Sequence, residues 1–127
     1  MAYSVLIVDD SAVMRQALRR LFRAARGFEI CGEARDGNEA IEMVHELKPE
    51  LVVLDLCMPG INGLTTARLL RGINSPPIIL YSMNAEEIAE REAYECGVAA
   101  VVSKAEGINS LIKKARMLLG GSEAQAC

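Results

Sequence analysis

The chain of 127 residues is long enough to form one domain with a buried core and too short for two. Its formal charge of −3 argues against an extended nucleic-acid surface, so we expect no direct nucleic acid binding by this chain. Because its apolar runs are only a few residues long, none can span a bilayer, and the N-terminus lacks the features of a secretory signal. These properties predict a cytoplasmic protein that is not associated with a membrane.

The four cysteines, Cys31, Cys57, Cys96 and Cys127, stand far apart and form no CxxC pair. His45 is the only histidine, so a zinc site built from cysteine and histidine is not expected. The apolar content can supply a core without disulfide bonds. We therefore expect free thiols.

Five short apolar runs recur along the chain at fairly even spacing. Two of them, VLIV and LVVL, are apolar throughout, as expected of strands that are covered on both faces. The second run is the least clear, because Glu29 interrupts it. In chain order the predicted strands are Val5–Val8, Phe28–Cys31, Leu51–Leu54, Ile78–Tyr81 and Ala99–Val102.

Apolar residues with helical spacing fill the intervals between these runs. In chain order the predicted helices cover residues 13–24, 40–47, 64–70, 88–96 and 111–119. Pro49 ends the second of them, Gly97 the fourth and Gly120–Gly121 the fifth. This alternation predicts an α/β fold with a doubly wound parallel sheet. We expect one domain over residues 1–120 and a flexible C-terminal tail over residues 121–127.

Polar side chains follow several of the predicted strands at the point where each strand ends. Asp9–Asp10 follows the first strand, Asp55 the third and Ser82 the fourth, and Lys104 comes shortly after the fifth. In open α/β sheets the functional crevice lies outside the carboxyl ends of the strands. We therefore expect three carboxylates, one hydroxyl and one amine on a single rim.

Each of these residues also has an interpretation that involves no function. An aspartate after a strand is commonly a helix cap or a turn residue, and Asp9–Asp10–Ser11 could simply cap the first helix. A lone lysine is commonly solvated, and a lone serine commonly forms a turn. This local interpretation does not explain why all of them fall at the same end of a parallel sheet.

A cluster of carboxylates needs a counter-charge, because two like charges ~4 Å apart repel by about 4 kcal/mol at an effective dielectric of about 20. Hard carboxylate oxygens without histidine or thiolate support suit Mg²⁺ better than zinc, and Mn²⁺ could substitute. Mg²⁺ commonly bridges carboxylates and phosphate oxygens. Lys104 could neutralise a transferring phosphoryl group, and Ser82 could donate a hydrogen bond to it.

Four segments of the chain resemble the response-regulator receiver domains of two-component signalling, the CheY-like superfamily. They are VLIVDDS at residues 5–11, LVVLDLCMPGING at 51–63, ILYS at 79–82, and Lys104. The resemblance spans Val5 to about Leu119. It implies that residues 1–120 form a receiver domain with a flavodoxin-like (βα)5 fold and the strand order 2-1-3-4-5.

The resemblance also implies a role for each residue of the metal site. Asp10 and Asp55 would ligate Mg²⁺ directly, and Asp9 would act mainly through a bound water. The backbone carbonyl of Cys57 would complete the protein ligands.

For the signalling reaction, the resemblance implies that Asp55 accepts a phosphoryl group from a sensor histidine kinase or a histidine phosphotransfer protein. Lys104 would pair with the phosphoryl group, and Ser82 would be the switch hydroxyl. The chain would thus be a phospho-acceptor that assists its own phosphorylation and dephosphorylation, and not an enzyme. An unknown downstream protein would read the face formed by residues 86–95 and 108–119.

Three positions depart from the pattern of this family. Val101 stands where many receivers carry an aromatic residue, so an aromatic rotamer switch is not expected. Ala105 replaces the proline that commonly follows the lysine, which removes the expectation of a cis peptide bond. Met83 replaces a small residue after the switch hydroxyl, so we expect slow loss of the phosphoryl group.

Five arginines lie on or just after the first predicted helix, and four of them, Arg15, Arg19, Arg23 and Arg26, follow at four- and three-residue steps on one face. They could form a solvated face. They could also dock an acidic partner such as the kinase, because this helix begins at the rim that carries the aspartates.

Other functions remain open for such a chain. A small Mg²⁺-dependent phosphatase with an aspartate nucleophile uses similar residues, but its DxD pattern is absent here, where Asp9 and Asp10 are adjacent. In a flavodoxin-like flavin carrier, these two aspartates would repel the flavin phosphate. A receiver that has lost phosphorylation is a third alternative. The residues do not distinguish a free-standing regulator from part of a longer one.

Overall fold

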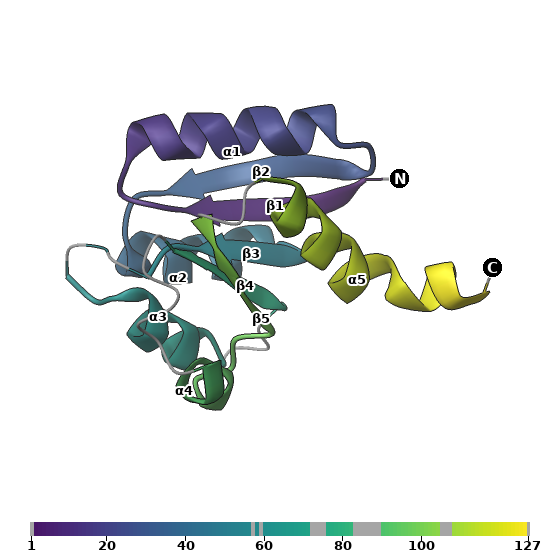
Figure 1. The fold of residues 1–127 in the computed structure, drawn as a ribbon. Coiled ribbons are helices and arrows are strands. Elements are labelled where there is room, and N and C mark those ends of the chain that lie inside the picture. Colours follow the sequence, from purple (N-terminus) through teal and green to yellow (C-terminus); the bar gives the residue numbers. More distant parts are fainter. Residues whose placement is uncertain are drawn as a thin grey trace.

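The computed structural model describes residues 2–56, 58, 60–71, 76–82, 90–104 and 108–126, with the backbone alone at 90, 108 and 121–126. Strands and helices alternate along this part of the chain (Figure 1). The strands are β1 (Tyr3–Val8), β2 (Phe28–Ala34), β3 (Leu51–Leu54), β4 (Ile78–Ser82) and β5 (Ala100–Ser103). The helices are α1 (Ala12–Ala24), α2 (Gly37–Leu47), α3 (Gly63–Leu70), α4 (Glu90–Glu95) and α5 (Ile108–Ala126).

The five strands form one parallel sheet in the order β2-β1-β3-β4-β5. This confirms the expected flavodoxin-like α/β fold and its strand order. β1 and β3 are neighbours in the middle of the sheet, and their last residues, Val8 and Leu54, are paired. Because all the strands run in the same direction, the residues that follow them meet at one edge.

Helices cover both faces of the sheet, with α1 and α5 on one side and α2, α3 and α4 on the other (Figure 1). Alternate residues of a strand point to opposite faces. In β1, Leu6 and Val8 pack on the side of α2, while Val5 and Ile7 pack against α1 and α5. This double burial is the reason why the central strands are apolar at every position.

Side chains cap three of the helices at the amino end. Ser11 accepts a hydrogen bond from the backbone N–H of Met14 at 3.2 Å, which starts α1 directly after the two aspartates that follow β1. Asp36 and Asn62 start α2 and α3 in the same way. None of the helices in the described ranges is long and apolar enough to cross a membrane.

One predicted helix end is wrong. α5 was expected to end at Gly120–Gly121, but it continues to Ala126, and its end extends beyond the sheet in Figure 1. A glycine costs a helix about 1 kcal/mol but keeps its N–H, so it ends a helix only where it turns to a positive φ. Gly97 does so after α4 (φ +97), whereas Gly120 does not. The flexibility of residues 121–127 stays a prediction.

Candidate functional site

Three of the four aspartates of the chain lie together at the carboxyl edge of the sheet. Asp9 and Asp10 follow β1, and Asp55 follows the neighbouring β3. Each offers a carboxylate oxygen, and these oxygens all lie within 4.8 Å of one another. Asp9 and Asp55 are buried, at 2% and 7% exposure, while Asp10 is exposed. The structure thus brings together the carboxylates that the sequence predicted to meet.

Lys104 supplies a positive charge to the two buried carboxylates. Its Nζ lies 3.2 Å from Asp9 Oδ2 and 3.3 Å from Asp55 Oδ1. The lysine follows β5, so its side chain reaches back toward the carboxylates that follow β1 and β3. Because only 9% of its side chain is exposed, water screens this interaction weakly.

The pKa of both partners is raised above its ordinary value. Burial, and then the charge of Asp9, raise the pKa of Asp55 above its ordinary value, and attraction to Lys104 only partly offsets them. For Lys104, burial works in the opposite direction, but the attraction of Asp55 and Asp9 outweighs it and raises the pKa. Ionised Asp55 therefore lacks full compensation, and a cation at this site would supply it.

Every polar group of Asp9 takes part in a hydrogen bond. Its Oδ1 accepts from the backbone N–H of Ser11 at 2.9 Å, and its Oδ2 accepts from Lys104. Its carbonyl oxygen accepts from Arg15 Nη1 at 2.7 Å, and its own N–H donates to Ala34 at 3.1 Å. Both carboxylate oxygens of Asp9 are thus already engaged.

The backbone around Asp55 is held by its neighbours in space. The N–H of Asp55 donates to the carbonyl of Val8 at 2.9 Å, and the N–H of Gly63 donates to the carbonyl of Leu56 at 2.8 Å. A Cβ at Gly63 would lie 2.4 Å from the carbonyl oxygen of Asp55. The chain after β3 therefore folds back so closely that only glycine fits at the start of α3.

Ser82 is the last residue of β4, between β3 and β5, and is 1% exposed. It pairs in register with Ser103, the residue before Lys104, so it lies on the same edge as the aspartates. The other predicted position in this part of the site, Cys57, lies outside the described residues, as do Met83 and Ala105.

Two contacts of the site were not anticipated from the sequence. Lys104 Nζ lies 5.7 Å from the centre of the Tyr81 ring, which is a cation–π geometry. Arg15 was expected on a solvated or docking face, but its side chain is only 14% exposed and bonds to Asp9 and Glu33. The only sequence signal for Arg15 was its position one helical turn after Ser11, beside the aspartates.

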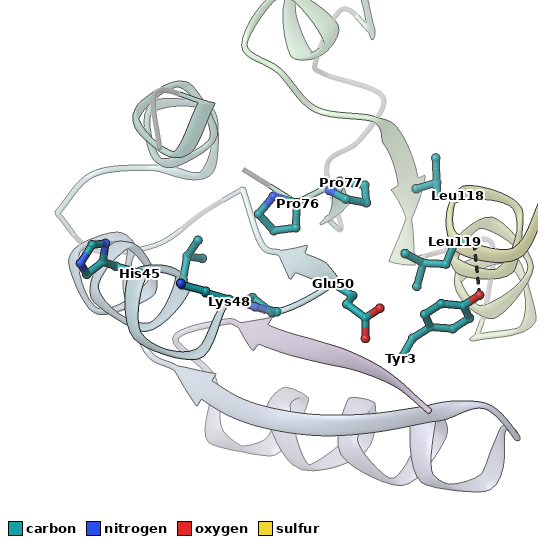
Figure 2. Close-up of a pocket in the computed structure, with 10 residues that line it drawn as sticks. Tyr3, His45, Lys48, Glu50, Pro76, Pro77, Leu118 and Leu119 are labelled. Carbon is teal, nitrogen blue, oxygen red and sulfur yellow. Dashed lines mark hydrogen bonds between the residues drawn. The ribbon is translucent and has the colours of Figure 1, made fainter. Parts of the chain in front are cut away.

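A separate hollow of about 610 Å³ lies at the opposite edge of the sheet (Figure 2). Its lining includes Tyr3 at the start of β1, Glu50 just before β3, and Leu119 in α5. The hydroxyl of Tyr3 donates to the carbonyl of Leu119 at 3.3 Å. Because this hollow lies at the amino ends of the strands, it is distinct from the acidic cluster.

The donor set of the acidic cluster fits a hard divalent cation. All three ligand atoms are carboxylate oxygens, and the exposed Asp10 leaves the cluster open to solvent on one side. Mg²⁺ is commonly bound by one or two carboxylates together with waters. The cluster can therefore hold Mg²⁺ or Mn²⁺.

The chain belongs to the response regulator receiver domain family, whose model matches residues 5–116. It is therefore the receiver domain of a two-component response regulator, as the motifs around the aspartates and Lys104 indicated. This membership disfavours both a phosphatase and a flavin carrier as alternatives.

Relatives of known function contain this domain as part of longer chains. A protein-glutamate methylesterase/protein-glutamine glutaminase of Pyrococcus abyssi is 43% identical over 102 residues, which are 79% of this chain and 28% of the relative. The response regulator GacA of Pseudomonas protegens is 30% identical over 118 residues, which are 92% of this chain and 55% of the relative. The chain thus spans about a quarter to a half of the length of these relatives.

Solved structures show the same fold. The response regulator domain of Thermotoga maritima CheB superposes with a TM-score of 0.88 and 30% identity, covering 94% of this chain and 98% of that one. The CheX–CheY–BeF3–Mg²⁺ complex of Borrelia burgdorferi gives a TM-score of 0.81 and 26% identity, covering 90% of this chain and 87% of that one.

Proposed function

We propose that this chain is a phosphorylation switch in which Asp55 accepts a phosphoryl group from a sensor histidine kinase or a histidine phosphotransfer protein. The observation that carries the proposal is the bridge of Lys104 to Asp55 and Asp9 within the acidic cluster. It supports the proposal because the proposed nucleophile Asp55, the proposed metal-binding carboxylates and the positive charge of Lys104 lie close together at the open edge of the sheet.

In the transfer, a carboxylate oxygen of Asp55 forms a bond to phosphorus as the bond from phosphorus to the imidazole nitrogen of the donor breaks. The imidazole leaves with the electron pair of that bond and takes a proton from solvent. The product on Asp55 is an acyl phosphate. Asp55 must be ionised to attack, and Lys104 at 3.3 Å favours the ionised form.

The three aspartates of the cluster would bind the metal in different ways. We propose Asp10 and Asp55 as direct ligands, with Asp9 acting through a water, because both oxygens of Asp9 already accept hydrogen bonds. The carbonyl of Cys57 remains the expected further ligand. When bound, Mg²⁺ or Mn²⁺ would supply positive charge against the phosphoryl oxygens.

After transfer, Lys104 and Ser82 would contact the phosphoryl oxygens from β5 and β4. These strands lie beside each other, so movement of the two residues can reach the face formed by α4, β5 and α5. Phosphorylation would then shift the equilibrium between two states of this face, which a downstream protein reads. Val101, which is half-buried, stands where an aromatic switch would be, so the shift would proceed without that side chain.

Acetyl phosphate with Mg²⁺ is expected to raise the intact mass of the wild type by about 80 Da, the mass of one phosphoryl group. Asp55→Asn should show no gain, because the amide is not a nucleophile. Asp36→Asn is the matched control, since this aspartate caps α2 outside the cluster and asparagine caps equally well. Removal of Mg²⁺ with EDTA should abolish the gain. An equal gain in Asp55→Asn would identify a different acceptor and refute the proposal.

Asp55→Asn is also expected to stabilise the metal-free protein at pH 7. The raised pKa of Asp55 means that its ionisation costs folding free energy, and this cost grows as pH rises from about the ordinary value of 3.8 through the higher folded value. Each 1 kcal/mol of added stability would raise Tm by roughly 3 to 5 °C, and the difference should vanish near pH 3. Mg²⁺ should raise Tm of the wild type more than that of the variant. Calorimetry that finds the variant less stable at pH 7 would contradict this.

A further inference from the structure

Arg15 lies in the first turn of α1 and is bonded to the loop that carries two of the aspartates. Its Nη1 donates to the carbonyl oxygen of Asp9 at 2.7 Å, and its Nε donates to Glu33 Oε1 at 3.2 Å. The guanidinium is planar and presents its donors in a fixed arrangement. Two partners on one rigid group therefore define the position of the Asp9 carbonyl relative to β2, the strand that carries Glu33.

The contact acts on the peptide group that joins Asp9 to Asp10. Because this group is planar, fixing the carbonyl oxygen of Asp9 also fixes the plane in which the nitrogen of Asp10 lies. The side chain of Asp9 is held separately, by Ser11 and Lys104. Asp10 is exposed, and its backbone nitrogen belongs to the same peptide group as the carbonyl that Arg15 contacts.

The anchor of Arg15 is partly shielded from water. The side chains of Arg15 and Glu33 are 14% and 22% exposed, and Glu33 also pairs with Arg19 through its other oxygen. Other arginines of α1, such as Arg20 and Arg23, are exposed. The arginines of α1 thus divide into a pair engaged with β2 and a group that faces solvent.

We propose that Arg15 is a positioning residue for the cation site: it holds the Asp9–Asp10 peptide so that the carboxylate of Asp10 faces Asp55. The inference rests on the proposed function of the cluster as a Mg²⁺ site. It also revises the docking hypothesis, because a change at Arg15 affects the site itself and will slow phosphorylation by small-molecule donors as well as by a kinase.

The sign of the effect separates positioning from simple electrostatics. Removal of a positive charge near three carboxylates would by itself tighten cation binding. Loss of a positioning contact weakens it, and the loss of such outer contacts commonly costs metal sites about 10- to 100-fold in affinity. Arg15→Met keeps most of the unbranched stem and the helix propensity of the side chain, and it removes both hydrogen bonds.

The test is a titration of the protein with Mn²⁺ in the absence of a phosphodonor. Electron paramagnetic resonance measures the concentration of free Mn²⁺ at each step. Arg15→Met is expected to raise the Kd for Mn²⁺ by about tenfold. Arg15→Lys should also weaken binding, because an ammonium group cannot bridge both partners in the same way. Arg20→Met removes the same charge from the exposed side of α1 and should leave Kd unchanged or slightly lower. An Arg15→Met protein with a Kd equal to or below that of the wild type overturns the proposal.

Glu33→Gln provides a second variant that retains Arg15 and loosens its anchor. It should weaken Mn²⁺ binding less than Arg15→Met, and an unchanged Kd counts against the anchor. Phosphoryl uptake from acetyl phosphate distinguishes a failure of the positioning role of Arg15 from a failure of the proposed function. Arg15→Met should be slow at low Mg²⁺ and approach the wild-type rate at saturating Mg²⁺. If the wild type itself takes up no phosphoryl group, it is the proposed function that fails.

Discussion

Lys104→Met is expected to slow phosphoryl uptake from acetyl phosphate by about 10²- to 10³-fold, the cost of removing one group that stabilises developing negative charge in a shielded site. Lys104 is the cation that the structure places within 3.3 Å of both Asp9 and Asp55. Methionine preserves most of the aliphatic stem of the lysine and removes the charge. The loss should persist at saturating Mg²⁺, which distinguishes it from the effect of Arg15→Met.

The same substitution should destabilise the metal-free protein in a pH-dependent way. Without Lys104, the pKa of Asp55 rises further, because the attraction that lowered it is lost. The difference in the free energy of unfolding between the variant and the wild type should be small below pH 3.8, the ordinary pKa of the Asp55 side chain. It should grow as pH rises through the pKa of Asp55 in the folded protein. In the wild type, the raised pKa of Lys104 adds stability at pH values below 10.5, the ordinary pKa of lysine. The difference in stability should therefore narrow again above that pH.

The rate and the stability are measured by intact-mass time courses and by thermal unfolding at several pH values. Lys113→Met is the matched control, since Lys113 is exposed on α5 and lines the same hollow as Ala25, at the end of α1 opposite to the two aspartates. It should match the wild type in both measurements. A wild-type rate of uptake in Lys104→Met would contradict the role proposed for this lysine.

Gly63→Ala is expected to destabilise the protein by about 2 to 3 kcal/mol, toward the upper end of the range for overpacked sites. Its Cβ would lie 2.4 Å from the carbonyl oxygen of Asp55 and 2.8 Å from Leu56 Cα. Both are backbone atoms in the chain that leaves β3, so no side-chain rotation relieves the contact. The shift needed would displace Asp55 and also slow phosphoryl uptake.

Urea unfolding followed by circular dichroism measures the stability change. Gly120→Ala is the control, because a Cβ at Gly120 meets nothing within 4 Å and the residue lies inside α5. That change should stabilise the protein by about 0.5 to 1 kcal/mol through helix propensity. Equal stability of Gly63→Ala and the wild type would show that the chain after β3 can relax without cost.

Much of the fold follows from the order of residues along the chain. VLIV and LVVL are apolar at every position because both faces of the sheet are covered, so they identify central parallel strands without any knowledge of their partners. β2 was harder to recognise, since it lies at an edge of the sheet and Glu29 is exposed within it. The strand order came from the resemblance to receiver domains, because periodicity carries no information about which strands are neighbours.

The acidic site was predictable for a topological reason, because in a parallel sheet the residues that follow each strand lie at the same edge. Their positions in the chain alone therefore assigned to one rim the residues Asp9, Asp10, Asp55, Ser82 and Lys104. The bridge from Arg15 to the Asp9 carbonyl and Glu33 could not be assigned in this way. It depends on the placement of α1 over β2, which brings together residues 18 positions apart in the chain. The extension of α5 past Gly120 likewise depends on a backbone φ that glycine leaves open. The sequence by itself determined the α/β fold class and the edge where the charged groups meet, because both depend on the pattern along single strands and helices. Only the tertiary structure decided which charged groups bond to one another, because those contacts depend on how separate elements pack.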